Sequence, residues 1–291
     1  LHVSSWLIAG SLLLGCRPVE TDDAPVKGPL IRPAPEAPAP PPETTLPDFV
    51  KLAETVDDSI VSIVSTVKIT DATAPDKGKG RMRGIGSGII VSREGHIITN
   101  EHVVRDAAEV TVELHRQRSV SAKILAADPK LDLALLQVDE PVAALSPIEL
   151  REEPAKVGEW VMAIGQPFAL GNTVTVGVIS GLGRDHGDLG RPPGLDPNGY
   201  WSFIQTDASI NVGNSGGPLV DRHGRVVGIT TAVRSDGQGL AFAVPAPMAA
   251  HFFAEVREHG KVRHPRLGLR AENAGPRTFP ERMAVVRITK V

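Results

Sequence analysis

From residue 60 onward the chain is a series of short β-branched and apolar runs, each bounded by glycine, proline or aspartate. The runs lie at 60–69, 88–91, 96–99, 110–114, 122–126, 134–138, 160–164, 173–182, 203–206, 226–231 and 241–244. Many short strands with few helices between them are typical of antiparallel barrels or sandwiches, not of a parallel α/β sheet. A break near residues 152–158 divides the runs into similar halves. We therefore predict an all-β fold with strands at about 60–152 and 158–246.

Two short helices are expected beside these strands. The first is indicated by apolar residues at helical spacing, namely Phe49, Leu52, Ala53 and Val56. The second is expected to open at Pro247 and to stop at Gly260. Its shared apolar face consists of Ala249, Phe252, Phe253 and Val256.

Composition narrows the function classes. Of the 291 residues, 41% are hydrophobic, which is enough for a sizeable core. The net charge of −3 gives no indication of nucleic acid as the main partner. One cysteine cannot form an intramolecular disulfide framework. The chain has no HExxH motif and no cysteine pair for zinc, so we predict no metal and no cofactor.

The single cysteine, Cys16, directly follows the apolar run 6–15. That run is too short for an ordinary membrane-spanning helix and resembles the core of a signal peptide. Its end, Leu13-Leu-Gly-Cys16, resembles the bacterial lipobox, in which the signal is cut before a cysteine that becomes lipidated. We therefore expect a signal peptide at 1–16 and a membrane-anchored lipoprotein on the periplasmic side of the cell envelope. A signal peptide with an incidental cysteine, which would give a secreted protein, and a short uncleaved anchor are the alternatives.

Residues 17–46 are predicted to form a disordered linker. In the stretch 31–43 proline stands at nearly every other position. Such a segment cannot pack a core and favours extended polyproline II, which suits a spacer beside a lipid anchor. A PxxP-type ligand is the competing interpretation.

The stretch 211–221 reads NVGNSGGPLVD and places Ser215 among three glycines. Serine beside glycine is common turn chemistry, so the motif alone does not identify a nucleophile. A serine nucleophile needs a base, a group that orients the base, and donors for the oxyanion that forms. The glycines would let the N–H groups of Gly213 and Ser215, which flank Asn214, form such an oxyanion hole.

Two upstream residues could complete a catalytic set. His102 follows the apolar run 97–99, where a base could face a cleft. A core or turn histidine that is hydrogen-bonded to backbone groups would show the same sequence pattern. Asp132 leads the apolar run 133–138, and a carboxylate entering a buried strand needs a partner. An imidazole N–H would serve, but so would local backbone N–H groups. The order His102, Asp132, Ser215 is one in which catalytic triads occur on β-barrels.

Three blocks carry a family resemblance. The stretches Thr99-Asn-Glu-His102-Val-Val, Asp128-Pro-Lys-Leu-Asp132 and 205–219 resemble the catalytic blocks of the HtrA/Deg family of trypsin-like (chymotrypsin-fold) serine endopeptidases. Four further blocks, 84–91, 165–168, 175–184 and 239–245, resemble other family blocks in the family's order. The resemblance covers about 47–262 as a protease domain. It implies two six-stranded antiparallel β-barrels with the active site between them, and envelope protein quality control, often by trimeric enzymes.

The same resemblance assigns the primary specificity pocket to Ile210, Ala232 and Leu240. All three are apolar or small, so the pocket should favour Val, Ala, Ile or similar residues at the cleaved position. Such residues are normally buried in folded proteins, so unfolded polypeptides are the expected substrates. Residues 266–269 and 283–288 resemble the opening strands of the family's PDZ domain, so 263–291 is expected to be the start of an incomplete PDZ domain.

The predicted function is therefore a serine endopeptidase of the bacterial envelope that cleaves unfolded or misfolded proteins after small or medium apolar residues. The alternative is a proteolytically silent chaperone or scaffold that holds unfolded polypeptides, because a fold does not determine function. A phosphate loop at Gly84-x-Gly86-x-Gly88 is not favoured. The spacing is not GxGxxG, and no Lys-Ser/Thr follows it.

Overall fold

The computed structural model describes residues 46–70, 79–114, 118–139, 145–166, 173–190, 194–211, 213–233, 239–264, 270–273 and 286–290. The chain divides into two units after Leu46, and the description that follows concerns the second. The predicted signal peptide, Cys16, almost all of the proline-rich linker, and Val212 lie outside the described residues.

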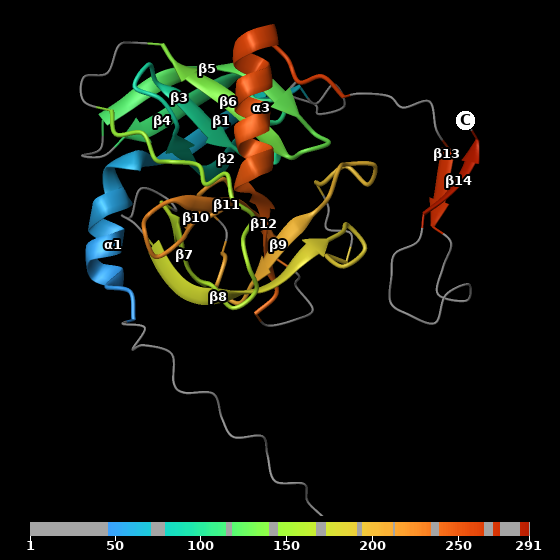
Figure 1. Cartoon of the computed structure of the whole chain (residues 1–291). Helices are drawn as coiled ribbons and strands as arrows, with labels where there is room; N and C mark the ends of the chain where they lie inside the picture. Colours follow the sequence, from blue (N-terminus) through green and yellow to red (C-terminus); the bar gives the residue numbers. More distant parts are fainter. Residues whose placement is uncertain are drawn as a thin grey trace, which may run out of the picture. The chain divides into compact units, whose positions relative to one another are not determined.

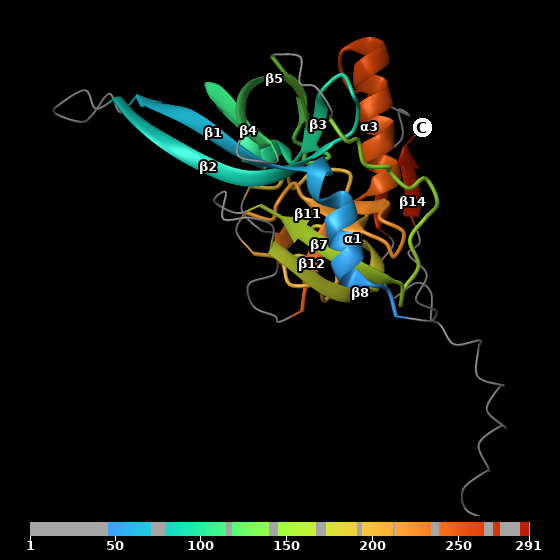
Figure 2. The same ribbon diagram turned by 90° about the vertical axis from the view of Figure 1, so that its left-hand side faces the viewer.

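The first half of the domain is a closed antiparallel barrel with the strand order β1-β2-β3-β6-β5-β4 (Figure 1). Its strands are β1 (Ile60–Thr70), β2 (Lys79–Ile90), β3 (His96–Thr99), β4 (Glu109–Leu114), β5 (Arg118–Asp128) and β6 (Leu133–Val138). Alternation along β4 shows how the sequence builds it, because Val110, Val112 and Leu114 face the core and their neighbours do not. Figure 2 shows β1 and β2 extending beyond the barrel as a long hairpin.

The second half is another closed barrel, with the order β10-β11-β12-β9-β8-β7. Its strands are β7 (Trp160–Gly165), β8 (Thr173–Arg184), β9 (Phe203–Thr206), β10 (Pro218–Val220), β11 (Val226–Val233) and β12 (Ala241–Pro245). The predicted pair of six-stranded antiparallel barrels is confirmed. Two details differ from the prediction. The three-residue β10 follows a glycine pair too closely to stand out, and β2 starts nine residues earlier than predicted because glycines and arginines interrupt its apolar pattern.

Helices pack around the barrels as the apolar spacing predicts. In α1 (Phe49–Val56) the Asp48 carboxylate accepts a hydrogen bond from the Lys51 N–H at 3.0 Å, which caps the helix start. The helix ends in a short 3-10 turn, η1 (Asp57–Ser59). The Phe49 ring lies 6.0 Å from the Trp160 ring at the start of β7. In α3 (Ala246–His259), Gly260 takes a left-handed φ of 70° and ends the helix, as expected. A one-turn helix, α2 (Glu101–Val104), was not predicted.

One apolar cluster joins the two barrels. It contains side chains of the first barrel, such as Ile98 and Leu133, and side chains of the second, such as Ile164 and Phe242. Helix α3 packs on β6, β11 and β12 and so contacts both barrels. The barrels therefore hold loops from each half in fixed relation.

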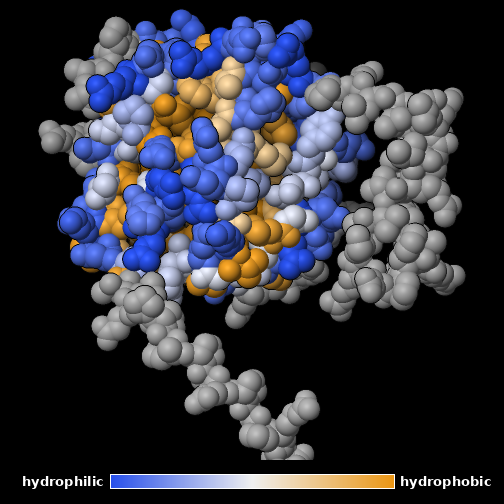
Figure 3. All heavy atoms as spheres, in the orientation of Figure 1, coloured by the Kyte–Doolittle hydropathy of each residue, from blue (hydrophilic) through white to orange (hydrophobic). Residues whose placement is uncertain are grey.

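Two further strands follow α3 in the described part of the chain. Strands β13 (Arg270–Asn273) and β14 (Val286–Lys290) form an antiparallel pair within the predicted PDZ segment. None of the helices in the described ranges is long and apolar enough to cross a membrane. On the face drawn in Figure 3, hydrophilic side chains predominate and apolar patches lie between them.

Candidate active site

His102 lies on α2, the single helical turn that directly follows β3. Its ring Nδ1 is 2.9 Å and 3.0 Å from the two carboxylate oxygens of Asp132. The His102 backbone N–H also donates to Oδ1 of the same carboxylate, at 3.1 Å. A carboxylate only accepts hydrogen bonds, so Nδ1 carries the proton and Nε2 of the neutral ring can act as a base.

Asp132 is buried, with 1% of its surface exposed, in the turn before β6. Its φ of 51° is a left-handed conformation that aspartate tolerates better than most residues. The Asn100 side-chain amide donates to the Asp132 carbonyl at 3.0 Å and holds this turn. The Thr231 hydroxyl donates to Asp132 Oδ2. The carboxylate therefore has donors at both oxygens, as a buried charge requires.

Ser215 lies in the loop before β10, and its neighbour Gly216 has a φ of 86°. A Cβ on Gly216 would collide with the carbonyl oxygen of Ser87 and the hydroxyl of Thr99, so only glycine fits there. The Ser215 hydroxyl donates to the carbonyl oxygen of Thr231 at 3.3 Å. Thr231 therefore contacts Asp132 through its hydroxyl and Ser215 through its carbonyl, which joins the three predicted residues in one site.

Three successive carbonyls of this loop are anchored. The oxygens of Gly213 and Ser215 accept from the Ser87 hydroxyl and the Ser87 N–H, at 2.7 Å and 2.8 Å. The oxygen of Asn214 accepts from the Thr230 hydroxyl at 2.6 Å. In a trans peptide the C=O and the following N–H point in opposite directions, so the Ser215 N–H points away from Thr230.

The backbone N–H groups of the three predicted oxyanion-hole residues, Gly213, Asn214 and Ser215, differ in whether they are already hydrogen-bonded. Gly213 has a φ of 101°, which glycine adopts without strain. The N–H of Asn214 donates to the Asn211 carbonyl at 3.0 Å and so is already used within the loop. The Asn214 side chain is fully buried against Gly165, where a Cβ would lie 2.7 Å from the Asn214 Cα. Asn214 therefore supports the loop, and the N–H groups of Gly213 and Ser215 are left as candidate donors.

A hollow of about 200 Å³ lies beside this loop. It is lined by Ala208, Ser209, Ile210, Asn211, Gly239, Leu240 and Ala241. Two of the predicted specificity residues, Ile210 and Leu240, are in this lining. The third, Ala232, pairs with Phe242 between β11 and β12, but its side chain lies outside the described part of the structure. None of the described residues that line the hollow carries a charge, and its volume limits it to a small group.

The residues that sequence reasoning missed are hydroxyl and amide groups: Ser87, Thr99, Asn100, Thr230 and Thr231. Each is buried within or next to an apolar run. Buried polar groups need hydrogen-bond partners, and that rule could have marked them as candidates. In the described ranges, no three His, Cys, Asp or Glu side chains lie where they could share a metal ion.

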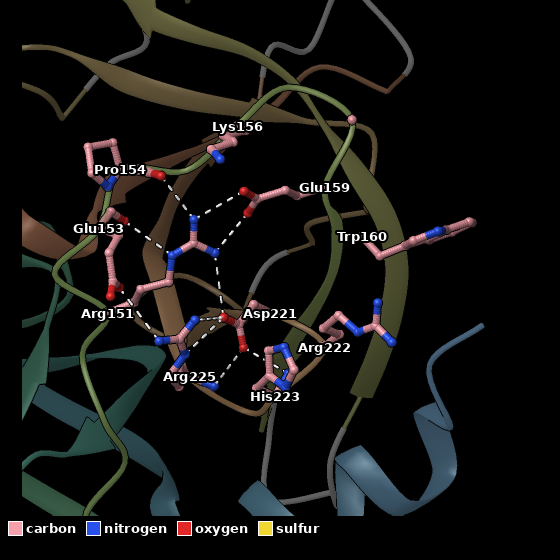
Figure 4. Close-up of a pocket in the computed structure, with 11 residues that line it drawn as sticks. Arg151, Glu153, Pro154, Lys156, Glu159, Trp160, Asp221, Arg222, His223 and Arg225 are labelled. Carbon is pink, nitrogen blue, oxygen red and sulfur yellow. Dashed lines mark hydrogen bonds and ion pairs between the residues drawn. The ribbon is translucent and has the colours of Figure 1, made fainter. Parts of the chain in front are cut away.

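A second, larger hollow of about 430 Å³ is lined by none of the predicted catalytic or specificity residues (Figure 4). At its centre the Arg151 guanidinium binds the Glu159 carboxylate at 2.8 Å and 3.1 Å and Asp221 at 3.5 Å. Arg225 binds Asp221 at 3.0 Å and 3.1 Å. Burial acts to raise the pKa of Asp221, but backbone N–H groups of Arg225 and His223 and the Arg225 guanidinium outweigh it and lower the pKa. This network joins the segment before β7 to the turn after β10.

The chain as a whole is similar to known serine proteases. The trypsin-like peptidase domain matches residues 86–229. The periplasmic serine endoprotease DegP of Salmonella typhimurium is 41% identical over 194 residues, which are 65% of this chain and 39% of that protein. The HtrA-type protease AlgW, solved with a decapeptide, is 32% identical with a TM-score of 0.67, over 84% of this chain and 79% of that one. A serine endoprotease from Yersinia pestis is 31% identical with a TM-score of 0.60, over 77% and 72%. The chain spans about half the length of the curated relatives it matches.

Proposed function

This chain belongs to the HtrA/Deg family of trypsin-like serine proteases, and from that premise we propose that it is a serine endopeptidase with Ser215 as its nucleophile. The observation that carries the proposal is the contact of Thr231 with both Asp132 and Ser215, beside the hydrogen bond from His102 Nδ1 to Asp132. The alternative roles, a histidine hydrogen-bonded to backbone and an aspartate that caps a turn, do not account for the contact of Thr231 with both Asp132 and Ser215.

Each residue has a role in an acyl-enzyme reaction. His102 Nε2 takes the proton of the Ser215 hydroxyl as the oxygen attacks the peptide carbonyl carbon. The charge that develops on the carbonyl oxygen is bound by the N–H groups of Gly213 and Ser215. His102 then gives its proton to the leaving amine, and the C–N bond breaks. A water molecule, activated by the same nitrogen, releases the acyl group from Ser215.

Asp132 keeps the His102 ring in the tautomer that leaves Nε2 unprotonated and stabilises the imidazolium that forms. The Ser215 hydroxyl is hydrogen-bonded to the Thr231 carbonyl oxygen, so we propose that it turns toward His102 when substrate binds. Catalytic hydrogen bonds are often loose in unliganded enzymes and shorten in the substrate complex.

We propose that the 200 Å³ hollow receives the side chain before the cleaved bond. Ile210 and Leu240 line it, and we place Ala232 there as well by the family resemblance. A small, uncharged hollow with Ile210 and Leu240 in its lining favours Ala, Val or Ile, which are mostly buried in folded proteins, so the proposed substrates are unfolded or misfolded polypeptides. The AlgW structure with a decapeptide supports polypeptide substrates in this family.

The domain plan and location are part of the same proposal. We propose a lipoprotein signal peptide at 1–16 with lipidation of Cys16, a spacer at 17–46, the protease domain at 47–262 and the start of a PDZ domain at 263–291. The relatives named as periplasmic endoproteases support the periplasmic side of the envelope. A homotrimer, as in other members of the family, is the proposed assembly.

The deciding experiment is digestion of unfolded casein by the full 291-residue chain beside its Ser215→Ala variant. The wild type is expected to cleave casein, and the variant is expected to be inactive. A fluorophosphonate probe should label only the wild type, because it reacts with an activated serine. Casein left intact by the wild type, with suppressed aggregation that survives Ser215→Ala, would instead favour the chaperone.

A further inference from the structure

Ser87 lies on β2, where the first barrel meets the loop that carries Ser215. It is completely buried, and each of its polar groups has a partner. Its N–H donates to the Ser215 carbonyl at 2.8 Å, and its own carbonyl accepts from the Thr99 hydroxyl at 2.7 Å. Its side-chain oxygen donates to the Gly213 carbonyl at 2.7 Å and accepts from the Gln166 N–H at 2.9 Å.

The direction of the Ser87 hydroxyl hydrogen bond is imposed by its neighbours. A serine hydroxyl has one proton to donate and lone pairs that accept. The Gln166 N–H can only donate, so it occupies a lone pair and leaves the proton for the Gly213 carbonyl. Gln166 is the first residue after β7 of the second barrel. One hydroxyl of the first barrel therefore ties the Gly213 loop to the end of a strand in the second barrel.

That hydrogen bond holds the peptide plane next to the oxyanion site. The Gly213 carbonyl and the Asn214 N–H belong to one planar peptide. Ser87 anchors its oxygen, and the Asn211 carbonyl anchors its N–H at 3.0 Å. With this plane fixed at both ends, the backbone torsions of Gly213, including its φ of 101°, determine where the preceding peptide and the Gly213 N–H point.

We propose that Ser87 is a positioning residue for the oxyanion site: its hydroxyl holds Gly213 in the conformation that presents its N–H to the reacting carbonyl oxygen. This inference rests on the proposed endopeptidase function and deepens it. Ser87 itself does not touch the reacting atoms. Loss of its hydroxyl should therefore weaken binding of the transition state and leave binding of the ground-state substrate intact.

The test is Ser87→Ala in the full chain, which removes the hydroxyl and keeps the backbone hydrogen bonds. Complete removal of an oxyanion donor costs about 10²–10³ in rate, so a misplaced donor should lower kcat/KM on an apolar-P1 peptide about 10- to 100-fold. KM should change less than about twofold, because the loss is confined to the transition state. Affinity for a peptide aldehyde, whose adduct carries the same oxygen, should fall by the same factor as kcat/KM.

The matched control is Ser62→Ala. Ser62 lies opposite Ser87 in the β1–β2 register and is also buried, but its hydroxyl has no partner among the described residues. It should keep wild-type kcat/KM. Equal kcat/KM for the two variants, or an effect of Ser87→Ala confined to KM, would overturn the inference.

A second variant, Ser87→Cys, covers the case in which Ser87→Ala does not fold. A thiol is a weak donor, so its kcat/KM should fall below that of the wild type; undiminished kcat/KM would contradict the inference. Wild-type protein that leaves casein intact overturns the proposed function and this inference together. Wild-type protein that cleaves casein, with an equally active Ser87→Ala, overturns this inference alone.

Discussion

The hydroxyl of Ser215 is hydrogen-bonded to the carbonyl oxygen of Thr231, 3.3 Å away. The same threonine binds the Asp132 carboxylate through its own hydroxyl. A single residue of β11 thus contacts the proposed nucleophile with its main chain and the proposed orienting carboxylate with its side chain. Because these two contacts use different groups, they can be removed separately by mutation.

Thr231→Val removes the hydroxyl, keeps the β-branched shape and keeps the carbonyl bonded to Ser215. The buried Asp132 carboxylate then loses one donor. A hydrogen bond to a charged group is worth about 1.5–3 kcal/mol, so kcat/KM should fall at least about tenfold. Peptidase assays beside Thr111→Val, a β4 substitution outside the site, measure this. An undiminished kcat/KM would show that the Thr231 hydroxyl is not needed.

Asp132→Asn should reduce kcat about 10³- to 10⁴-fold with little change in KM. The amide N–H of asparagine can donate a hydrogen bond to an unprotonated His102 Nδ1, which stabilises the wrong ring tautomer, in which Nε2 carries the proton and is no longer a base. Steady-state kinetics of the wild type and the variant on one peptide substrate measure kcat and KM separately. Asp139→Asn is the control, because the Asp139 carboxylate pairs with an exposed lysine, Lys123, at 3.0 Å. A loss confined to KM in Asp132→Asn would contradict the proposed role.

Leu240→Ala should enlarge the proposed specificity pocket and shift its preference toward larger side chains. The change removes three side-chain carbons, and space for even one methylene group is worth about 1–3 kcal/mol, so the kcat/KM ratio of a P1-Leu peptide over a P1-Ala peptide should rise about tenfold or more. The measurement is a peptide series that differs only at this position. Val174→Ala, on β8 outside the pocket, should leave the ratio unchanged. If Leu240→Ala also leaves it unchanged, the pocket lies elsewhere.

Asp221 should make stability depend on pH. Its pKa in the folded protein is below the ordinary value of 3.8, so the fold prefers the ionised form. Its contribution is therefore complete above the unfolded pKa and is lost as the pH falls through the lower, folded pKa. Asp221→Asn should lower the free energy of unfolding by about 1–3 kcal/mol at pH 7, with a smaller difference below about pH 3.8.

Urea unfolding at pH 7 and in acid measures that difference. The control is Glu153→Gln, because Glu153 is 70% exposed and lies 3.6 Å from Arg225 of the same network. An exposed ion pair contributes about 0–1 kcal/mol, so this variant should unfold almost like the wild type. An Asp221→Asn effect of the same size at both pH values would show that hydrogen-bond geometry matters there and ionisation does not.

The sequence predicts the strands well because burial and alternation are local. Runs such as 96–99 and 203–206 coincide with β3 and β9. It does not predict α2, which is only one turn long, or the roles of Ser87 and Thr231. The contact from Ser87 to Gly213 spans 126 positions, and the contact from Thr231 to Asp132 spans 99. Such contacts depend on how the two barrels are oriented, and no short sequence window carries that information.

Because the two barrels share an apolar cluster, separating them costs much more free energy than rearranging the Gly213 loop. Parting the barrels would expose fully buried side chains such as Ile98 and Phe242, at about 1.5–3 kcal/mol for each. Rearranging the Gly213 loop breaks only a few hydrogen bonds, each with a net value of about 0.5–1.5 kcal/mol. The Gly213 loop can therefore change its conformation on a rigid frame, and a mutation that disturbs this loop need not lower the melting temperature of the protein.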